Sequence, residues 1–212
     1  MSWEELSARE QARYADGTAR LAPEQLVRLG NAAYGAGLSL LMLGRAGEAA
    51  NWLERAAARW RESWEHATPT SWGRPIGTIK ATLIAGRDAD AADFSGWALE
   101  LGSEAAESPI GRYAAVLALL VLGRDNEARQ LASSLRGRDD FPPAVADALA
   151  ACAAHDADGY LEAVEAVLAS FEARAEFLED VPVADTVIVL QALAARRGLA
   201  AELSSPLLPG SG

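Results

Sequence analysis

The heptapeptide LGRAGEA at residues 43–49 decides the fold, because two further copies of its pattern follow it along the chain. They are AGRDADA at residues 85–91 and LGRDNEA at residues 122–128, and all read apolar–Gly–Arg–x–x–acid–Ala. A glycine in this place predicts a helix that ends in a left-handed conformation, and the acid favours the positive end of the next helix. The alanine predicts close approach of the two helices. The sequence therefore predicts helix pairs, with a fourth, more divergent turn at residues 154–159.

The rest of the chain agrees with this pattern. Ala, Leu, Glu and Arg recur at helical spacing, and the alternation typical of strands is nearly absent. Ser2 and Glu5 have capping-box spacing, Pro23 suits the first turn of a helix, and Gly44 suits a helix end. We predict an all-α chain forming a single helical-repeat domain over residues 1–212, with about ten helices. The predicted elements are an N-terminal helix at 2–16, helix pairs at about 23–66, 75–101, 110–136 and 143–178, a capping helix at 183–197 and a frayed tail at 205–212.

The first helix pair resembles a tetratricopeptide (TPR) repeat. Small and apolar residues stand at the offsets where that family places its packing residues, namely Gly37, Leu40, Ala49, Leu53 and Ala56. In the next two copies mainly the turn and its alanine persist, and the repeat lengths are irregular, so the chain is similar to a divergent member. The resemblance implies a TPR-like α-solenoid of antiparallel helix pairs that binds another protein through an extended face.

A second resemblance concerns the segment VPVADTVIVLQALAARRG at residues 181–198. This segment is similar to the carboxyl end of some all-helical immunity proteins of bacterial toxin systems. The resemblance implies a bacterial protein that neutralises a cationic toxin by covering its active surface.

Composition excludes several classes of protein. The chain has 30 acidic and 19 basic residues, a net charge of −11, which disfavours nucleic acid as a partner. Cys152 is the single cysteine, so no internal disulfide forms, and the first residues lack the pattern of a signal peptide. The most apolar runs, 113–122 and 187–195, are far shorter than the roughly 20 residues of a membrane span. We expect a cytoplasmic protein with no membrane segment.

Patterns typical of catalytic and metal sites are scarce. Cys152 and His155 have the spacing of one helix face and could supply two ligands of a metal site. No second ligand pair accompanies them in the sequence. The Glu-x-x-His motif of di-iron bundles is absent. The Gly35–Gly37 stretch lacks the preceding strand and third glycine of a nucleotide-binding loop. We therefore predict no catalytic residues, no metal and no cofactor, and we expect that the protein is not an enzyme.

The longest interruption between predicted helices is a candidate binding loop. It reads HATPTSWGRPIG at residues 66–77, and Lys80 follows it. Trp72, Arg74 and Lys80 would suit an anionic or aromatic ligand group, because guanidinium and ammonium groups pair with anions and indole stacks. The alternative is structural: Trp72 and Pro75 staple the next helix to the core, while Arg74 pairs with a surface acid.

Acidic residues concentrate late in the chain. Residues 1–138 hold 17 acids and 16 bases, whereas residues 139–185 hold 12 acids and only Arg174. Four glutamates on a helix predicted from about 159 to 178 have same-face spacing in two pairs, Glu162 with Glu165 and Glu172 with Glu176. They would form a surface for a basic protein partner. The alternative is a solvated outer face.

Aromatic residues mark the third helix, where Trp52, Trp60 and Trp64 fall on one side. Such a stripe is more typical of a core face than of a ligand groove. Taken together, these patterns favour a non-catalytic protein–protein interaction module, one form of which is an immunity-type protein. The alternative function is a small-ligand-binding protein, or an enzyme, that uses the region 66–80.

Overall fold

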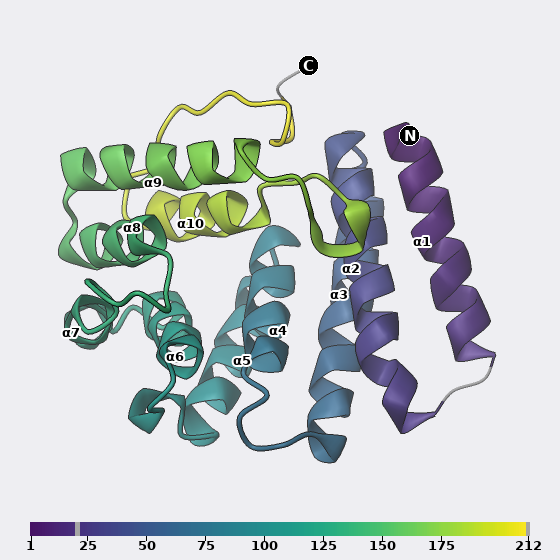
Figure 1. The fold of residues 1–212 in the computed structure, drawn as a ribbon, viewed down its shortest axis with the longest axis horizontal. Coiled ribbons are helices and arrows are strands. Elements are labelled where there is room, and N and C mark those ends of the chain that lie inside the picture. The colour runs from purple at the N-terminus through teal and green to yellow at the C-terminus, as the bar shows by residue number, and fades with distance from the viewer. Residues whose placement is uncertain (20–21, 211–212) are drawn as a thin grey trace. The chain divides into compact units, whose positions relative to one another are not determined.

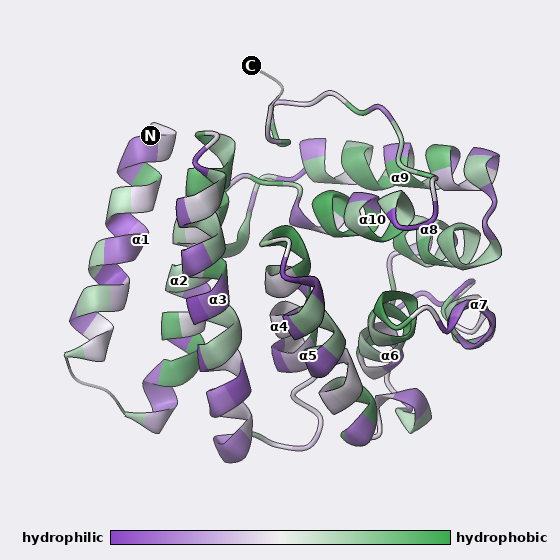
Figure 2. Cartoon of the chain, turned by 180° about the vertical axis from the view of Figure 1, so that it is seen from behind, coloured by the Kyte–Doolittle hydropathy of each residue, from purple (hydrophilic) through white to green (hydrophobic). Residues whose placement is uncertain are grey.

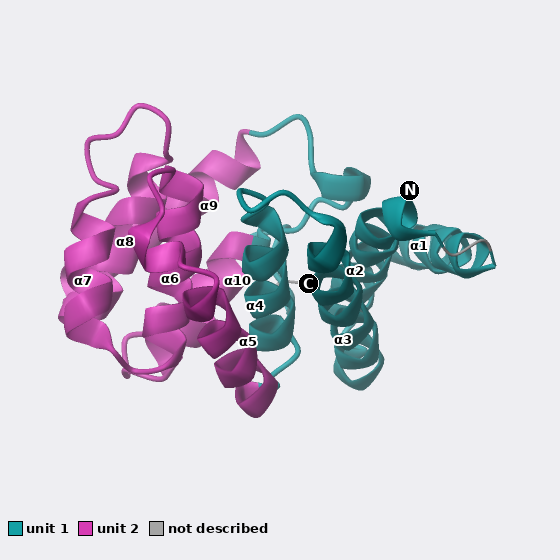
Figure 3. Ribbon diagram, turned by 90° about the horizontal axis from the view of Figure 1, so that it is seen from below, with its two compact units in different colours: residues 1–87, 174–185, 204–212 teal, residues 88–173, 186–203 magenta. Residues whose placement is uncertain are grey.

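The computed structural model describes residues 1–19 and 22–210. The chain packs as two compact units (Figure 3). Unit 1 comprises Met1–Arg87, Arg174–Asp185 and Ser204–Gly212, and unit 2 comprises Asp88–Ala173 and Thr186–Leu203. Both units are therefore built from segments that lie far apart in the sequence.

All regular elements in the described part of the chain are helices, which confirms the all-α prediction (Figure 1). In unit 1 they are α1 (Trp3–Thr18), α2 (Leu26–Met42), α3 (Ala46–Ser63) and α4 (Gly73–Ile84). In unit 2 they are α5 (Asp88–Glu100), α6 (Pro109–Val121), α7 (Asp125–Ser133), α8 (Pro143–Ala154) and α9 (Ala157–Glu172). The helix α10 (Asp185–Ala195) begins at the last residue of the middle segment of unit 1 and continues in unit 2.

The three repeated turns have the predicted left-handed glycines. Gly44, Gly86 and Gly123 have φ angles of 72°, 68° and 71°. In each turn the amide of the following arginine donates a hydrogen bond back to the last turn of the helix, as Arg45 N does to Leu40 O at 3.0 Å. This Schellman arrangement satisfies carbonyl groups that a helix end otherwise leaves without partners. The prediction from the glycines is confirmed.

The fourth, divergent turn reaches the same geometry without glycine. His155 adopts a φ of 55°, and the Asp156 amide donates to Ala151 O at 3.0 Å. The Asp156 carboxylate then accepts from Gly159 N at 3.0 Å and caps α9. A non-glycine residue in this region of φ costs roughly 1 kcal/mol, so this turn is less favourable than the three glycine turns.

The arginine of the turn has a structural role that the sequence pattern does not reveal. Arg45 donates through Nε and Nη2 to the two carboxylate oxygens of Glu48, at 2.7 and 2.6 Å. Arg124 makes the same bidentate contact with Glu127, at 2.8 and 2.5 Å. These hydrogen bonds lower the pKa of both glutamates. The middle copy differs, because Arg87 pairs instead with Glu54.

The alanine of each turn packs as predicted, since Ala49, Ala91 and Ala128 are buried. Close approach is clearest between α2 and α3, where a Cβ added to Gly37 would lie 2.7 Å from Leu53 Cγ. In unit 2, α6 is strongly apolar (Figure 2), and its residues from Ala114 to Leu120 are buried. Each unit therefore has an apolar core of its own.

A charged network joins α1 to the segment 174–185, here called the strap. The carboxylate of Glu10 is fully buried and accepts from Arg9 Nε and Arg13 Nη1, each at 2.7 Å. Arg13 also pairs with the carboxylate of Glu179, and Arg9 donates to the Glu179 carbonyl. Two cations thus compensate one buried carboxylate, and they also hold the strap in unit 1.

Three element boundaries confirm or correct the predictions. The capping box of Ser2 and Glu5 is present at the start of α1. The helix predicted to reach residue 178 ends at Glu172, and the chain continues into the strap. The tail predicted to be frayed is instead packed within unit 1 over residues 205–210: Leu208 is buried, and Ala184 N donates to Leu207 O at 3.0 Å. Residues 211–212 lie outside the described part.

Among the described helices, none combines the length and the apolar character that crossing a membrane requires.

Substitution of two glycines of unit 2 tests the turn geometry. Gly123→Ala should destabilise the protein by about 1 kcal/mol, because alanine resists a positive φ. Gly96→Ala makes the same chemical change inside α5, where an added Cβ meets nothing within 4 Å, and should stabilise by about 0.5–1 kcal/mol. Urea unfolding measures both values. Shifts of the same sign would contradict the left-handed turn.

Candidate functional site

A cavity of about 480 Å³ opens in unit 1. This volume lies in the range of sites for small organic ligands. Its walls come from α2, α3, α4, the loop before α4 and the strap, together with the first residue of α10, and every lining residue belongs to unit 1. The lining residues are Val27, Asn31, Tyr34, Trp60, Ser71, Gly73, Arg74, Ile76, Gly77, Lys80, Leu178 and Asp185.

The indole of Trp60 forms an aromatic wall of this pocket. Two glycines make room for it, since a Cβ at Gly30 would lie 2.5 Å from Trp60 Nε1 and one at Gly77 would lie 2.8 Å from the ring. Trp60 Nε1 donates to Asn31 Oδ1 at 3.2 Å, and the ring of Tyr34 lies 5.2 Å away, centroid to centroid. The packing fixes the indole in place. Of the tryptophan stripe on α3, Trp60 is both part of the core and part of the pocket.

An ion pair also lines the pocket. Lys80 Nζ lies 2.6 Å from Asp185 Oδ2, and both side chains are largely shielded from solvent, with exposed fractions of 13% and 18%. Tyr34 donates its hydroxyl hydrogen to the same oxygen of Asp185 at 2.8 Å. Because Asp185 is the first residue of α10, the positive end of that helix further favours its negative charge. The charge of Lys80 is therefore compensated inside the protein.

Arg74 supplies the uncompensated positive charge. Its Nε donates to Ser63 Oγ at 2.8 Å, and Ser63 Oγ in turn donates to Trp60 O at 2.7 Å. The two terminal nitrogens, Nη1 and Nη2, have no partner among the residues that the structure describes. Within the same limits the Nδ2 donor of Asn31 has none either, since Oδ1 accepts from Trp60. The pocket thus presents hydrogen-bond donors on a largely apolar wall.

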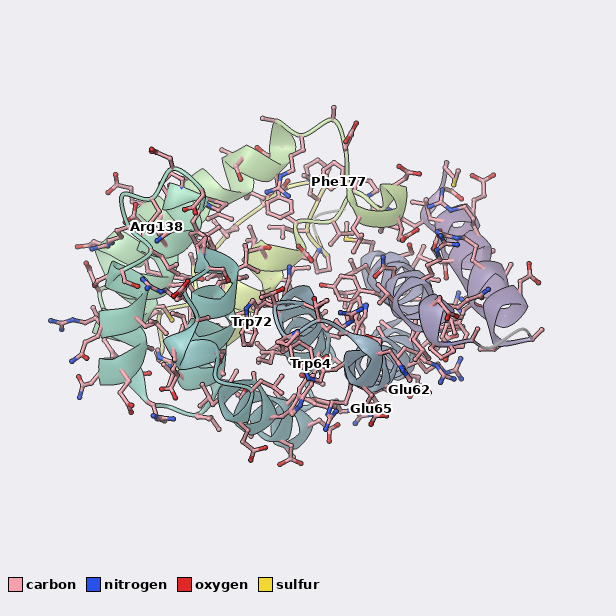
Figure 4. All side chains as sticks on the ribbon, turned by 60° about the horizontal axis from the view of Figure 1, so that its bottom comes forward. Glu62, Trp64, Glu65, Trp72, Arg138 and Phe177 are labelled. Carbon is pink, nitrogen blue, oxygen red and sulfur yellow. The ribbon has the colours of Figure 1, made fainter. Side chains whose placement is uncertain are left out.

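The predicted loop residues separate into two roles. Arg74 and Lys80 line the pocket, whereas Trp72 does not. Trp72 is 7% exposed and its ring packs 6.0 Å from that of Trp64 (Figure 4). Pro75 is buried as well. The structural interpretation therefore holds for Trp72 and Pro75, while Arg74 binds the Ser63 hydroxyl group rather than the expected acid.

The predicted acidic residues do not share one helix. Glu162, Glu165 and Glu172 are exposed on α9 in unit 2, and Glu176 is exposed in the strap of unit 1. The same-face pairing of Glu172 with Glu176 was wrong, because α9 ends at Glu172. Spacing along α9 does put Glu162, Glu165 and Glu172 on one face, together with Asp158.

The net charge is divided very unequally between the units. By sequence, unit 2 has 17 acidic and 7 basic residues, a net of −10. Unit 1 has 13 acidic and 12 basic residues, a net of −1. Unit 2 therefore carries nearly all of the negative charge, and any attraction of a basic partner acts mainly on it.

Cys152 and His155 have separate environments. The Cys152 thiol is fully buried, and burial raises its pKa to about 11, so it is protonated and unreactive at neutral pH. The His155 ring lies 2.8 Å from Asp125 Oδ2 instead. In the described part of the chain, no group of three or more His, Cys, Asp or Glu side chains is arranged to hold a metal ion.

Asp125 is the centre of a charged cluster in unit 2 that no sequence pattern revealed. Its carboxylate pairs with Arg197, which is almost fully buried, and with His155. Burial opposes ionisation of Asp125, but the hydrogen bonds from Arg197 and His155 outweigh it and lower its pKa below 3.8. Arg197 also donates to the carbonyls of Leu193 and Leu120, at 2.8 and 2.7 Å. The cluster ties the end of α10 to the turn before α7.

Comparisons with protein-family models, with curated proteins and with solved structures found no match. The assignment of the site therefore depends on its geometry. The pocket residues that the sequence did not reveal are Val27, Asn31, Tyr34, Leu178 and Asp185. Only Asp185 gave a signal, as an acid at the start of an apolar helical run.

A pH titration tests the Asp125 cluster. The pKa of Asp125 in the folded protein is below its ordinary value of 3.8. The ionised carboxylate therefore contributes its full stabilisation of the fold above pH 3.8, and this contribution is lost as the pH falls through the folded-state pKa. Asp125→Asn should cost about 2 kcal/mol at pH 7 and should flatten the loss of stability below about pH 4. Urea midpoints from pH 7 to pH 3 measure this, with exposed Asp90→Asn as control. Parallel losses in wild type and Asp125→Asn would refute it.

Proposed function

We propose that this protein is a non-catalytic binding protein whose unit 1 pocket receives a small organic anion. The observation that carries the proposal is the Arg74 guanidinium, which lines the cavity with both terminal nitrogens unpartnered among the described residues. A guanidinium stays protonated and presents a planar pair of donors that matches a carboxylate or phosphate group. The neighbouring Asn31 amide offers a further donor.

The charge balance of the pocket supports an anion over a cation. Lys80 and Asp185 compensate each other at 2.6 Å, so Arg74 gives the lining a net charge of +1. A cationic ligand would have to compete with Lys80 for Asp185 and would also face Arg74. An anion gains the charge of Arg74 in a cavity that is partly shielded from water, where such attraction is stronger than at an open surface.

The same ion pair supports binding rather than catalysis. A lysine acts as a nucleophile or base when its amine is neutral, whereas the Lys80 ammonium group is paired with the Asp185 carboxylate. Tyr34 donates to that carboxylate as well, which leaves Asp185 engaged by two partners. The residues that line the pocket are therefore suited to holding a ligand in place.

Removal of the Arg74 charge tests the proposed function. Benzoate, octanoate and phenyl phosphate should raise the melting temperature of the wild type, whereas benzyl alcohol, octanol and phenol should have much smaller effects. Arg74→Gln should weaken anion binding by roughly 10- to 100-fold in titration calorimetry, through loss of a charge-assisted contact. Arg129→Gln removes an exposed arginine of unit 2 and should leave affinity unchanged. Absence of binding by every anion would refute the proposal.

We also propose that the helix pairs form a divergent TPR-like α-solenoid in a bacterial cytoplasmic protein. The repeated turn supports this proposal, because Gly44 and Gly123 have the same geometry and both turns contain the same Arg–Glu contact. The buried Ala49 and Ala128 support it further. The single protonated thiol of Cys152 suits a reducing compartment.

A second candidate function is a protein–protein interaction through unit 2, including the immunity type. Two observations favour it: the net charge of −10 on that unit and the exposed glutamates on one face of α9. Glu162 and Glu165 have no ion-pair partner among the described residues. A basic protein would therefore gain attraction at this face without first breaking internal contacts there.

Charge neutralisation on α9 tests this second function. Glu162→Gln combined with Glu165→Gln should abolish capture of a stoichiometric basic protein from lysate of the source organism, at low and at moderate salt. The control is Asp90→Asn combined with Asp93→Asn, which removes the same charge from exposed positions of α5 at the same spacing. Equal loss with both double variants would mean that only net charge matters. Full retention with the α9 variant would exclude this face.

A further inference from the structure

Leu178 is an apolar side chain in an unusual position. It lines the unit 1 pocket and yet is 54% exposed, as one of the few large hydrophobic residues of the described chain that are not covered. An exposed leucine alone is ordinary, but an exposed leucine on the wall of a cavity offers apolar surface that a ligand would cover.

The strap holds Leu178 in place through an unfavourable backbone conformation. The two following residues, Glu179 and Asp180, both have left-handed backbone conformations, with φ angles of 53° and 54°. Residues other than glycine adopt this region only when the surrounding structure imposes it. Arg9 and Arg13 from α1 supply that constraint, because they bind the carbonyl and the carboxylate of Glu179. The position of Leu178 is therefore imposed by the surrounding contacts.

Leu178 shares the pocket with other apolar side chains. Val27 from α2 and Ile76 from α4 line the same cavity, as does the indole of Trp60. The polar groups with unpartnered donors, among the described residues, are those of Arg74 and Asn31. A ligand with one anionic group and a hydrocarbon body matches this lining, because the anionic group can accept from these donors while the hydrocarbon covers the apolar side chains.

The charge of the lining indicates how many negative charges that ligand has. With Lys80 and Asp185 paired, Arg74 contributes one positive charge. A monoanion is neutralised by this charge, whereas a phosphate dianion would bring a second negative charge close to the Asp185 carboxylate without compensation. A carboxylate also matches the two terminal nitrogens of the guanidinium.

We infer that the ligand of the pocket is an amphipathic monocarboxylate whose hydrocarbon chain covers Leu178, and that Leu178 sets the preference for chain length. This inference rests on the proposed function of the pocket. Arg74 binds the carboxylate, and the apolar wall, with Leu178 as its exposed member, takes the chain.

A chain-length series tests the inference. Titration calorimetry with butanoate, hexanoate, octanoate and decanoate should show affinity for the wild type rising up to about fourfold per added methylene until the pocket is filled. Leu178→Ser should flatten this rise and weaken decanoate more than butanoate, whereas Leu178→Met should retain it. The control is Leu161→Ser, which changes a leucine of α9 that is 42% exposed. Since Leu178 is exposed, its variants should keep the melting temperature of the wild type.

The outcomes separate the inference from the function on which it rests. If neither the carboxylates nor octyl phosphate bind, the anion-binding function itself fails, and if octyl phosphate alone binds, the function stands and the inference is wrong. If carboxylates bind with an affinity that does not depend on chain length, or if Leu178→Ser keeps the wild-type dependence, the function stands and the inference is wrong. Octyl phosphate and octylamine complete the series at equal chain length: tighter binding of either than of octanoate would overturn the monocarboxylate assignment.

Discussion

The left-handed residue at the end of a helix is the constraint on which the rest of the structure depends. A helix end leaves carbonyl groups without partners, and a chain that reverses immediately must satisfy them within a few residues. Gly44, Gly86 and Gly123 do so at a positive φ that other residues resist. His155 occupies the same place at the fourth turn. At the Gly44 and Gly123 turns the two joined helices, α2 with α3 and α6 with α7, pack on one another and bury the alanine that follows, Ala49 or Ala128. The same backbone conformation therefore serves helix packing in each unit.

A second constraint shapes the pocket: two positions beside Trp60 must be glycine. Any side chain at Gly30 or Gly77 would clash with the indole of Trp60, so the absence of a Cβ at these two positions makes the space for that ring. The ring then supports Asn31 by a hydrogen bond, and the backbone carbonyl of Trp60 accepts from Ser63, whose hydroxyl oxygen fixes Arg74. The orientation of the guanidinium group thus depends, through two hydrogen bonds, on the residue that those glycines accommodate.

The sequence predicts the parts of this structure that depend on local rules. The glycines predict where helices end, and the capping box of Ser2 predicts where α1 begins; both predictions are confirmed. Arg74 and Lys80 are candidates because the sequence predicts a long loop at 66–77, whereas the structure places both residues in α4, on the wall of the pocket. The pairing of Lys80 with Asp185, in contrast, joins residues far apart in the chain, and no periodicity reveals it. The end of α9 was also missed, because the strap is held by Arg9 and Arg13 of α1 rather than by a helix-breaking residue of its own.

In unit 1, a charged side chain that is not paired with an opposite charge of the protein itself marks the best candidate for a ligand-binding site. Several of its arginines meet a carboxylate: Arg9 and Arg13 compensate Glu10, Arg45 pairs with Glu48, and Arg87 pairs with Glu54. The exposed pairs of Arg45 and Arg87 contribute little to stability. Buried or exposed, an arginine whose charge is paired with a carboxylate has no net charge left to attract a ligand. Arg74 differs because its partner is a neutral hydroxyl group, which orients the guanidinium without neutralising it. A positive charge held in place by a neutral partner, on the wall of a cavity, is the arrangement that an anion-binding site requires.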